Sequence, residues 1–470
     1  MNLAAMVEGH PADRVALVDR DRTVTYGELR RRLGLLRGAL AARGIGRGDR
    51  VAVIGPNSIE LVEGHLALLG LGAVVVPLNP QSPAAELEQE RLAVGVTDSL
   101  STSAGEIDEL LAAGHDAVAL VDVDATDPAV LCFTSGTAGA PKAAILTHGS
   151  LRANVDQMAS GPDRLGPDDV VLGVLPLFHV FGFGVALDAT LHAGARLVLA
   201  SHFDPVGTLE LVTATGVTVL LGAPAMWIAW AQLPEATPEA FACVRHALSG
   251  AAKLPEDTAD ALEHRFGVVV REGYGLTEAS PVVTTSVGIA PRRGSVGKAL
   301  DGLEVRLVDE DGTDVLEGDA GEVWVRGPNV FAGYWEDPEA TARVLTADGW
   351  LRTGDVAVAD EDGYLYIVDR AKDLIIVSGF NVYPAEVEQV VADAPGVAEV
   401  CVVGIAHPTT GEAVRAFVVP TPGGAERVTE ENVVAWCRQR LARYKCPTSV
   451  LVVDELPKGL GGKVLRRVLR

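Results

Sequence analysis

Strand and helix patterns alternate along the first 275 residues, and this alternation restricts the fold more than any other feature of the chain. Residues 25–44 have apolar positions on one helical face, and Thr25 and Glu28 have the spacing of an N-terminal capping box. Apolar runs at residues 50–55 and 73–78 are typical of buried strands. Because strands that alternate with helices form βαβ units, we expect a largely parallel sheet.

The alternation begins again further along the chain. Strand patterns separated by helical or polar stretches recur at residues 196–200, 217–221, 244–250 and 268–270. They predict a second round of α/β winding. After about Pro291, alternating strand patterns are separated by Asp-Gly turns, which favour a small antiparallel region.

The C-terminal residues have a different pattern. From Lys372 onward, a helix pattern near Pro384, apolar strand patterns and a second helix pattern predict a small α+β unit, with the best boundary close to Arg370. The fold class is therefore α/β. We predict a large N-terminal domain over residues 1–371, built from two α/β wound subdomains and a small β subdomain, and a small mobile α+β domain over residues 372–470.

Length and charge limit the possible functions. A chain of 470 residues exceeds the usual size of a single core, so more than one domain is expected. The formal net charge of −24 argues against a general nucleic-acid binder. The 5 cysteines have no paired spacing, which favours free thiols in a reducing cytosol over a zinc site or a disulfide framework. Neither a signal peptide nor a membrane span is recognisable, so we expect a cytoplasmic protein without stable membrane insertion.

The segment FTSGTAGAPKAAILTH, residues 133–148, places hydroxyls and glycines before Lys142, directly after an apolar strand pattern. Backbone N–H groups of such a loop can converge on phosphate oxygens. The spacing of Gly136, Gly139 and Lys142 differs from that of the P-loop of NTPases, and Ala143 stands where a magnesium-binding Ser or Thr is required. The segment is thus either a phosphate loop of another kind or a surface turn.

A second segment, EGYGLTEASP at residues 272–281, combines a hydroxyl with a carboxylate. Thr277 offers the hydroxyl, and Glu278 offers a hard oxygen ligand that suits magnesium beside phosphates. A helix N-cap followed by an acidic first turn is the structural alternative. This segment alone does not decide between the two.

Two further segments carry charges that can serve a nucleotide site. In residues 349–370, Asp355 can accept the hydroxyls of a ribose, and Arg370 can add a fixed positive charge. A turn-forming Asp and a surface Asp-Arg pair are the alternatives. In residues 457–467, Lys463 follows glycines and can be delivered to a site on a mobile strap, whereas a solvated basic tail is the alternative.

In this order, the four segments resemble the signature set of the adenylate-forming superfamily, which includes acyl- and aryl-CoA synthetases, nonribosomal peptide adenylation domains and luciferases. The likeness extends from about Thr25 to Arg470, and LIIVSGFNVYPAEVE and PLFHVFG are most similar to fatty acyl-CoA synthetases. The resemblance implies a two-step reaction. A carboxylate attacks the α-phosphate of ATP to give acyl-AMP and pyrophosphate, and the CoA thiol then displaces AMP.

The resemblance also implies roles for residues that bind the phosphates. Thr277 would contact the α-phosphate, and Glu278 would hold Mg²⁺. Lys463 would bridge the substrate carboxylate and the phosphate during adenylation, and it should matter little for thioester formation. The implied contacts of the β- and γ-phosphates are Thr134, Ser135, Gly136, Thr137 and Lys142.

Other residues are implied around the nucleoside and CoA. Asp355 and Arg370 would bind the ribose, and Lys372 matches the hinge about which the C-terminal domain rotates, with a static ion pair as its alternative. The implied surroundings of adenine are Gly250, Ala251, Ala252, Gly273, Tyr274 and Gly275. The implied neighbours of the pantetheine tunnel are Ser378, Gly379 and Phe380.

The acyl pocket is implied by the segment PLFHVFGFGVAL. This segment supplies Phe178, His179, Phe181 and Phe183 near the place where relatives bind the acyl group. His179 would line the carboxyl end of the pocket, and a hydrogen-bonded core histidine is the alternative. Because this segment contains no carboxylate that could meet an amino group, we expect a fatty or other apolar acid rather than an α-amino acid.

Three departures from the family pattern keep other functions open. Ala138 stands where Thr is common, Ala143 stands where Gly is common, and the stretch between Pro80 and Ala129 is short for the family. The main hypothesis is an acyl-CoA synthetase that uses an apolar carboxylic acid, ATP and CoA, with Mg²⁺ as cofactor. The alternatives are a fatty acyl-AMP ligase that loads an acyl carrier protein, and a nucleotide- or acyl-binding homologue with reduced turnover.

Overall fold

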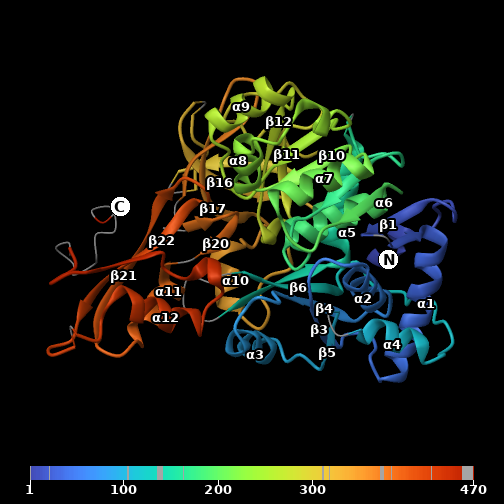
Figure 1. The fold of residues 1–470 in the computed structure, drawn as a ribbon, viewed down its shortest axis with the longest axis horizontal. Coiled ribbons are helices and arrows are strands. Elements are labelled where there is room, and N and C mark those ends of the chain that lie inside the picture. The colour runs from blue at the N-terminus through green and yellow to red at the C-terminus, as the bar shows by residue number, and fades with distance from the viewer. Residues whose placement is uncertain are drawn as a thin grey trace. The chain divides into compact units, whose positions relative to one another are not determined.

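The chain divides into two compact units by its internal contacts. The larger unit contains residues 1–80, 94–132 and 143–369, and the smaller unit contains residues 81–93, 133–142 and 370–470. A computed structural model describes residues 2–20, 22–102, 105–134, 141–161, 163–309, 312–316, 318–370, 375–382, 384–424, 426–457 and 469, with the backbone alone at residues 368–370, 381 and 385. Figure 1 shows the helices and strands of the chain, coloured by residue number.

A nine-stranded sheet forms the centre of the larger unit. Its strands, in spatial order, are β14 (Lys298–Ala299), β13 (Val282–Thr285), β12 (Val270–Gly275), β11 (His246–Ser249), β10 (Val219–Gly222), β8 (Val170–Gly173), β9 (Arg196–Leu199), β1 (Val15–Asp19) and β2 (Arg22–Thr25). The strands from β12 to β1 pair in parallel, and antiparallel pairs close both ends. This arrangement confirms the predicted parallel α/β sheet.

Two smaller sheets complete the strands of this part of the chain. A five-stranded sheet has the order β5 (Asp98–Ser101), β3 (Arg50–Ile54), β4 (Val74–Leu78), β6 (Pro128–Thr134) and β7 (Lys142–Thr147). A four-stranded sheet has the order β15 (Glu304–Val308), β16 (Gly321–Arg326), β17 (Leu351–Ala359) and β18 (Leu365–Arg370). The four-stranded sheet begins after residue 291, as the Asp-Gly turns predict, and β15, β16 and β17 pair antiparallel.

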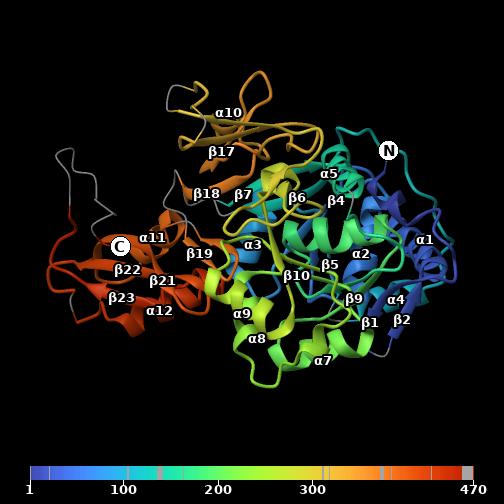
Figure 2. The same cartoon turned by 90° about the horizontal axis from the view of Figure 1, so that it is seen from above.

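Helices cover the two parallel sheets. The helices of the larger unit are α1 (Tyr26–Ala42), α2 (Ile59–Gly70), α4 (Glu106–Ala112), α5 (His148–Ser160), α6 (Ala189–His192), α7 (Pro205–Thr215), α8 (Pro224–Gln232), α9 (Glu256–Phe266) and α10 (Pro338–Val344), with the short helices η1 (Leu3–Val7), η2 (Phe181–Asp188), η3 (Pro238–Phe241) and η4 (Thr277–Ala279). Helix α8 packs against β10, which is labelled near it in Figure 2, and α9 packs against β12, which is labelled beside it in Figure 1.

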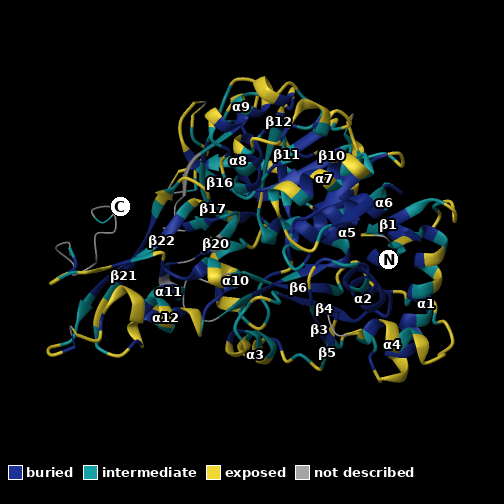
Figure 3. Cartoon of the chain, in the orientation of Figure 1, coloured by how far each residue is buried: buried dark blue, intermediate teal, exposed yellow. Residues whose placement is uncertain are grey.

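Local sequence explains where these elements begin and why they are buried. Thr25 Oγ1 accepts a hydrogen bond from the Glu28 nitrogen at 3.2 Å, so the predicted cap starts α1. Strand β4 is buried along its whole length, which explains its run of consecutive apolar residues. Figure 3 shows that buried residues are concentrated on the strands of both parallel sheets. None of the helices in the described ranges is long and apolar enough to cross a bilayer.

The smaller unit is an α+β structure. Its sheet has the order β20 (Phe380–Val382), β19 (Ile375–Val377), β22 (Gly411–Pro420) and β21 (Val397–His407), and β23 (Ser449–Val452) pairs with β22. The helices of this unit are α3 (Ala84–Ala93), α11 (Pro384–Ala392), α12 (Glu430–Arg438) and the short η5 (Arg443–Lys445). Residues 371–374, where we predict the domain boundary, lie outside the described residues.

A cluster of charged residues lies inside the smaller unit. Lys445 Nζ lies 2.9 Å from Glu86 Oε1 and 2.8 Å from Glu386 Oε1, so one ammonium group joins η5, α3 and α11. Glu90 follows Glu86 by one helical turn on α3. Burial, reinforced by the carboxylate of Glu86, raises the pKa of Glu90 to about 8. The cluster therefore contains more carboxyl groups than its single ammonium can neutralise.

The raised pKa of Glu90 predicts a stability that depends on pH. Because the unfolded chain releases this proton near pH 4.5 and the folded chain releases it near pH 8, ionisation destabilises the fold increasingly across this window and fully above it. Glu90→Gln removes that cost. We expect the variant to raise Tm at pH 9 by about 2 °C or more and to change Tm little at pH 5. Glu88→Gln, which changes an exposed carboxylate on the same helix, is the control for thermal unfolding followed by circular dichroism.

Candidate nucleotide and acid site

Glu278 lies on η4, directly after the carboxyl end of β12. Its carboxylate accepts a hydrogen bond from the Tyr334 hydroxyl at 2.5 Å. The Phe331 nitrogen donates to the Glu278 carbonyl at 2.9 Å, and Asn329 Nδ2 donates to the carbonyl of the next residue at 2.7 Å. Thr277 is the first residue of η4. The loop before α10 therefore holds η4, and with it both predicted phosphate and magnesium contacts, at the end of the strand.

One predicted ribose contact and one predicted adenine contact meet in the larger unit. The Tyr274 hydroxyl, on β12, donates to Asp355 Oδ2, on β17, at 2.7 Å. The Asp355 nitrogen donates to Thr353 Oγ1 at 3.1 Å. Tyr274 and Asp355 come from two segments that are 81 residues apart. The fold thus brings together two residues that the sequence predicts separately.

The other predicted adenine contacts lie at the same sheet edge. Strands β11 and β12 are parallel neighbours, with Ser249 opposite Glu272. Residues 250–252 therefore leave the sheet at the level of residues 273–275. In open α/β sheets, ligands bind outside the carboxyl ends of the strands, which is where these residues lie. Ala251 has a φ of +70°, an uncommon left-handed conformation for a residue other than glycine.

Two glycines allow close packing at this edge. A Cβ atom at Gly275 would lie 2.3 Å from the Pro281 carbonyl oxygen, so a larger residue cannot occupy the position without a backbone shift. A Cβ atom at Gly250 would lie 3.0 Å from the Phe181 ring. The Phe181 ring therefore lies against Gly250, and the predicted acyl segment reaches the predicted adenine segment.

His179 lies two residues before η2, in the segment predicted to line the acyl pocket. Its Nδ1 accepts a hydrogen bond from the Phe181 nitrogen at 3.2 Å. Desolvation lowers the pKa of His179 to about 4, so the ring is neutral near pH 7. A neutral ring whose Nδ1 already accepts a hydrogen bond suits a positioning role better than proton donation.

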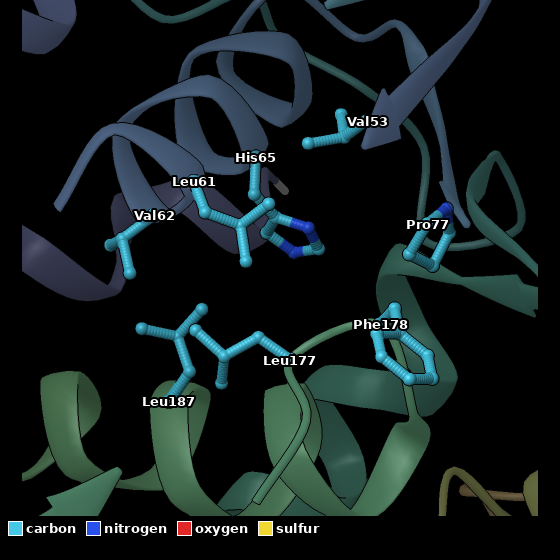
Figure 4. A pocket seen from close by; sticks show the side chains of 8 residues that line it. All are labelled: Val53, Leu61, Val62, His65, Pro77, Leu177, Phe178 and Leu187. Carbon is cyan, nitrogen blue, oxygen red and sulfur yellow. The ribbon is translucent and has the colours of Figure 1, made fainter. Parts of the chain in front are cut away.

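A small cavity lies behind this segment, between α2 and η2. The ring of His65 projects into it, and burial lowers the pKa of His65 to about 4 (Figure 4). The cavity is lined by Val53, Leu61, Val62, His65, Pro77, Leu177, Phe178 and Leu187. The centre of a water molecule can occupy about 10 Å³ of this cavity. The cavity therefore has room for about one water molecule and far too little room for an acyl chain.

The predicted phosphate loop follows a strand, as expected. Strand β6 ends at Thr134 and β7 begins at Lys142, and Thr134 Oγ1 donates to the Lys142 carbonyl at 3.4 Å. Ser135, Gly136 and Thr137 lie outside the described residues. The two ends of the loop therefore lie close together, on neighbouring strands. The roles of these residues stay predictions.

The predicted CoA contacts form the turn between β19 and β20. Ser378 has a φ of +51° and Gly379 a φ of +86°. The Phe380 ring stacks on Tyr444 of η5, with 4.4 Å between the ring centroids and 24° between the planes. Tyr444 thus supports this turn, although nothing in the sequence pattern around it distinguishes it from an ordinary core tyrosine.

Three other predicted site residues, or their side chains, lie outside the part of the chain that the structure describes. Lys463 and Lys372 lie outside the described residues, and the side chain of Arg370, at the end of β18, does so as well. Conversely, Tyr334, which contacts Glu278, was not predicted from the sequence. A single tyrosine in a loop carries no local signal of this contact, because its partner lies 56 residues away.

Comparison with known proteins identifies the family. The family model for the AMP-binding enzyme matches residues 3–97 and 88–335 of this chain. The family model for the AMP-binding enzyme C-terminal domain matches residues 386–463. The chain belongs to the AMP-binding enzyme family. The predicted resemblance to the adenylate-forming superfamily is therefore confirmed.

Similar members of the AMP-binding enzyme family are known for different acids. The feruloyl-CoA synthase of Amycolatopsis sp is 39% identical over 467 residues, covering 95% of this chain and 93% of that protein. The long-chain-fatty-acid–CoA ligase of Yersinia pestis is 35% identical over 519 residues, covering 98% of this chain and 92% of that protein. The solved o-succinylbenzoate CoA synthetase of Bacillus subtilis, bound with a product analogue, has a TM-score of 0.89 and 29% identity and covers 99% of this chain and 97% of that one.

Proposed function

We propose that this AMP-binding enzyme activates an apolar carboxylic acid in two steps. In the first step the acid carboxylate attacks the α-phosphate of ATP, which forms acyl-AMP and releases pyrophosphate. In the second step the CoA thiolate attacks the acyl carbonyl, which forms the thioester and releases AMP. Acid activation and CoA thioester formation are common to the relatives and the solved structure named above.

The observation that carries the proposal is the geometry at the end of β12. The Tyr274–Asp355 hydrogen bond of 2.7 Å and the Glu278–Tyr334 hydrogen bond of 2.5 Å lie on one short stretch of chain, from residue 274 to residue 278. A ribose hydroxyl can replace or share the Tyr274 contact at the Asp355 carboxylate. The same stretch can thereby hold a nucleoside at one end and a charged phosphate group at the other.

The donor set at Glu278 suits Mg²⁺. The residues that the structure describes contain no group of three or more His, Cys, Asp and Glu arranged to hold a metal. Mg²⁺ is commonly bound by one or two carboxylates together with nucleotide phosphates and water, so a single partly exposed carboxylate is a fitting protein ligand. Glu278 would hold the ion, with Tyr334 orienting one carboxylate oxygen. When bound, the ion neutralises negative charge on the triphosphate.

The identity of the acid substrate has to be determined by a direct screen. Fatty acids are the first candidates because the segments PLFHVFG and LIIVSGFNVYPAEVE are most similar to those of fatty acyl-CoA synthetases. Hydroxycinnamic acids are the second candidates because the feruloyl-CoA synthase relative is 39% identical to this chain. Both classes are apolar acids without an α-amino group.

An AMP-release screen tests the proposed function. The protein is incubated with ATP, Mg²⁺, CoA and one acid at a time, drawn from straight-chain acids of graded length and from hydroxycinnamic acids. We expect AMP, pyrophosphate and the acyl thioester in equal amounts. ADP as the only nucleotide product would exclude the reaction.

Two further arms separate the alternatives. If a phosphopantetheinylated carrier protein is acylated and CoA is not, the chain is an acyl-AMP ligase that loads a carrier. If ATP binds but no acid supports exchange of labelled pyrophosphate into ATP, the chain is a binding homologue without turnover. Either outcome would contradict CoA ligase activity.

Asp355→Ala is expected to weaken nucleotide binding. Because Asp355 is proposed to accept the ribose hydroxyls, we expect the KM for ATP to rise about tenfold in pyrophosphate exchange, with a smaller change in kcat. Asp362→Ala is the control, since Asp362 is an exposed acid on the same hairpin that pairs with Arg292. An unchanged KM for ATP in Asp355→Ala would remove Asp355 from the nucleotide site.

A further inference from the structure

Lys445 joins three segments that are distant in the chain. Its ammonium contacts Glu86 on α3 and Glu386 on α11, at 2.9 and 2.8 Å, and only 8% of its side chain is exposed. The second carboxylate oxygens of Glu86 and Glu386 are buried and have no hydrogen-bond partner among the described residues. Removing the ammonium would therefore leave two buried carboxylates without the positive charge that pairs with both of them.

The ion pairs hold a residue that supports the predicted CoA turn. Lys445 is the last residue of η5, so a fixed ammonium fixes this short helix and its Tyr444 ring. That ring stacks on Phe380, and η5 packs against β20. A continuous path of contacts thus runs from the Lys445 ammonium to the turn that contains Ser378 and Gly379.

The turn itself depends on such support. Ser378 has a φ of +51°, a conformation that residues with a Cβ rarely adopt unless the surrounding structure holds them there. The Phe380 ring follows directly and is partly buried against Tyr444. Loosening η5 would therefore release the aromatic contact that holds the far end of the turn.

We propose that Lys445 is a positioning residue for thioester formation, because its ammonium bridges Glu86 and Glu386 and so holds Tyr444 against Phe380 in the CoA turn. This inference rests on the proposed function. It assigns to Lys445 a role in the second half-reaction alone, since the path of contacts leads to the predicted CoA residues and not to the nucleotide residues of β12. A purely structural ion pair would instead affect both half-reactions through loss of folded protein.

Lys445→Met tests the inference, with Arg91→Met as the matched control. Arg91 lies on α3 in an exposed pair with Glu88 at 4.0 Å, so its loss removes one positive charge without touching the cluster. Each variant is assayed for acid-dependent pyrophosphate exchange and for conversion of supplied palmitoyl-AMP or feruloyl-AMP, whichever the wild type converts faster. For Lys445→Met we expect exchange per folded protein within about twofold of wild type, and a KM for CoA raised about tenfold.

Two more variants keep the test decisive if Lys445→Met folds poorly. Lys445→Arg retains the positive charge and should recover most of the thioester activity. Tyr444→Leu retains both ion pairs but removes the stacked ring, and it should reproduce the rise in the KM for CoA. A wild-type KM for CoA in Tyr444→Leu, or equal losses of both half-reactions in Lys445→Met, would overturn the positioning role while the proposed function stands. If wild-type protein forms no thioester with any acid, the proposed function fails and the positioning role fails with it.

Discussion

Lys463→Ala is expected to lower acid-dependent pyrophosphate exchange by about 10²–10³-fold, while conversion of supplied acyl-AMP to thioester stays within about threefold of wild type. By family resemblance, we propose that the Lys463 ammonium bridges the acid carboxylate and the α-phosphate as negative charge moves onto the phosphate oxygens. An ammonium placed at developing charge lowers the barrier of that step alone. The second step begins from acyl-AMP, where this charge has already been redistributed.

The matched control for this prediction is Lys458→Ala. Lys458 lies five residues earlier in the same basic segment, so its loss changes the net charge equally. We expect this variant to retain most of both half-reactions. Equal losses of exchange and of thioester formation in Lys463→Ala would contradict a role confined to adenylation. Unchanged exchange would show that the chain uses another cation for this step.

Glu278→Gln is expected to reduce pyrophosphate exchange by about 10²–10³-fold and to shift its dependence on Mg²⁺ to higher concentrations. Glutamine keeps the size of the side chain and can still accept a hydrogen bond from Tyr334, so η4 should keep its place. The substitution removes the negative charge that suits a hard divalent cation. The measurement is the rate of exchange across a titration of Mg²⁺ at saturating ATP.

Tyr334→Phe separates the two features of this site. It removes the hydroxyl that donates to Glu278 at 2.5 Å and leaves the carboxylate in place. Since Tyr334 is proposed to orient the carboxylate and not to bind the metal, we expect the rate of pyrophosphate exchange to fall by about tenfold or less. If Glu278→Gln leaves the Mg²⁺ dependence unchanged, the carboxylate serves the structure of η4 and the metal assignment is wrong.

The predictions for Lys463 and Lys445 together test whether the two half-reactions depend on different residues. Lys463→Ala should affect the first half-reaction, and Lys445→Met should affect the second. Both assays use the same protein and the same acyl-AMP, so the two variants act as controls for each other. A variant that merely unfolds would reduce both rates, which distinguishes loss of folded protein from loss of a specific role.

Local sequence was sufficient for most of the secondary structure. The cap at Thr25, the buried strands β3 and β4 and the strand before the phosphate loop follow from patterns a few residues long. Such patterns are reliable because capping needs only neighbouring residues, and a strand buried on both faces must be apolar at every position. The family motifs are equally local, which is why Glu278 and Asp355 could be proposed as site residues without a structure.

Contacts between distant residues could not be predicted in this way. Tyr274 meets Asp355 across 81 residues and Tyr334 meets Glu278 across 56, and Lys445 reaches Glu86 across 359. No short sequence pattern predicts these contacts, because each contact depends on how whole strands and helices pack. The parallel α/β architecture, the family and the chemical groups proposed for the site could all be derived from the order of the residues. Which of these groups share a hydrogen bond, and which aromatic ring and ion pairs support the turn predicted to meet CoA, depends on packing between distant segments and required the folded structure.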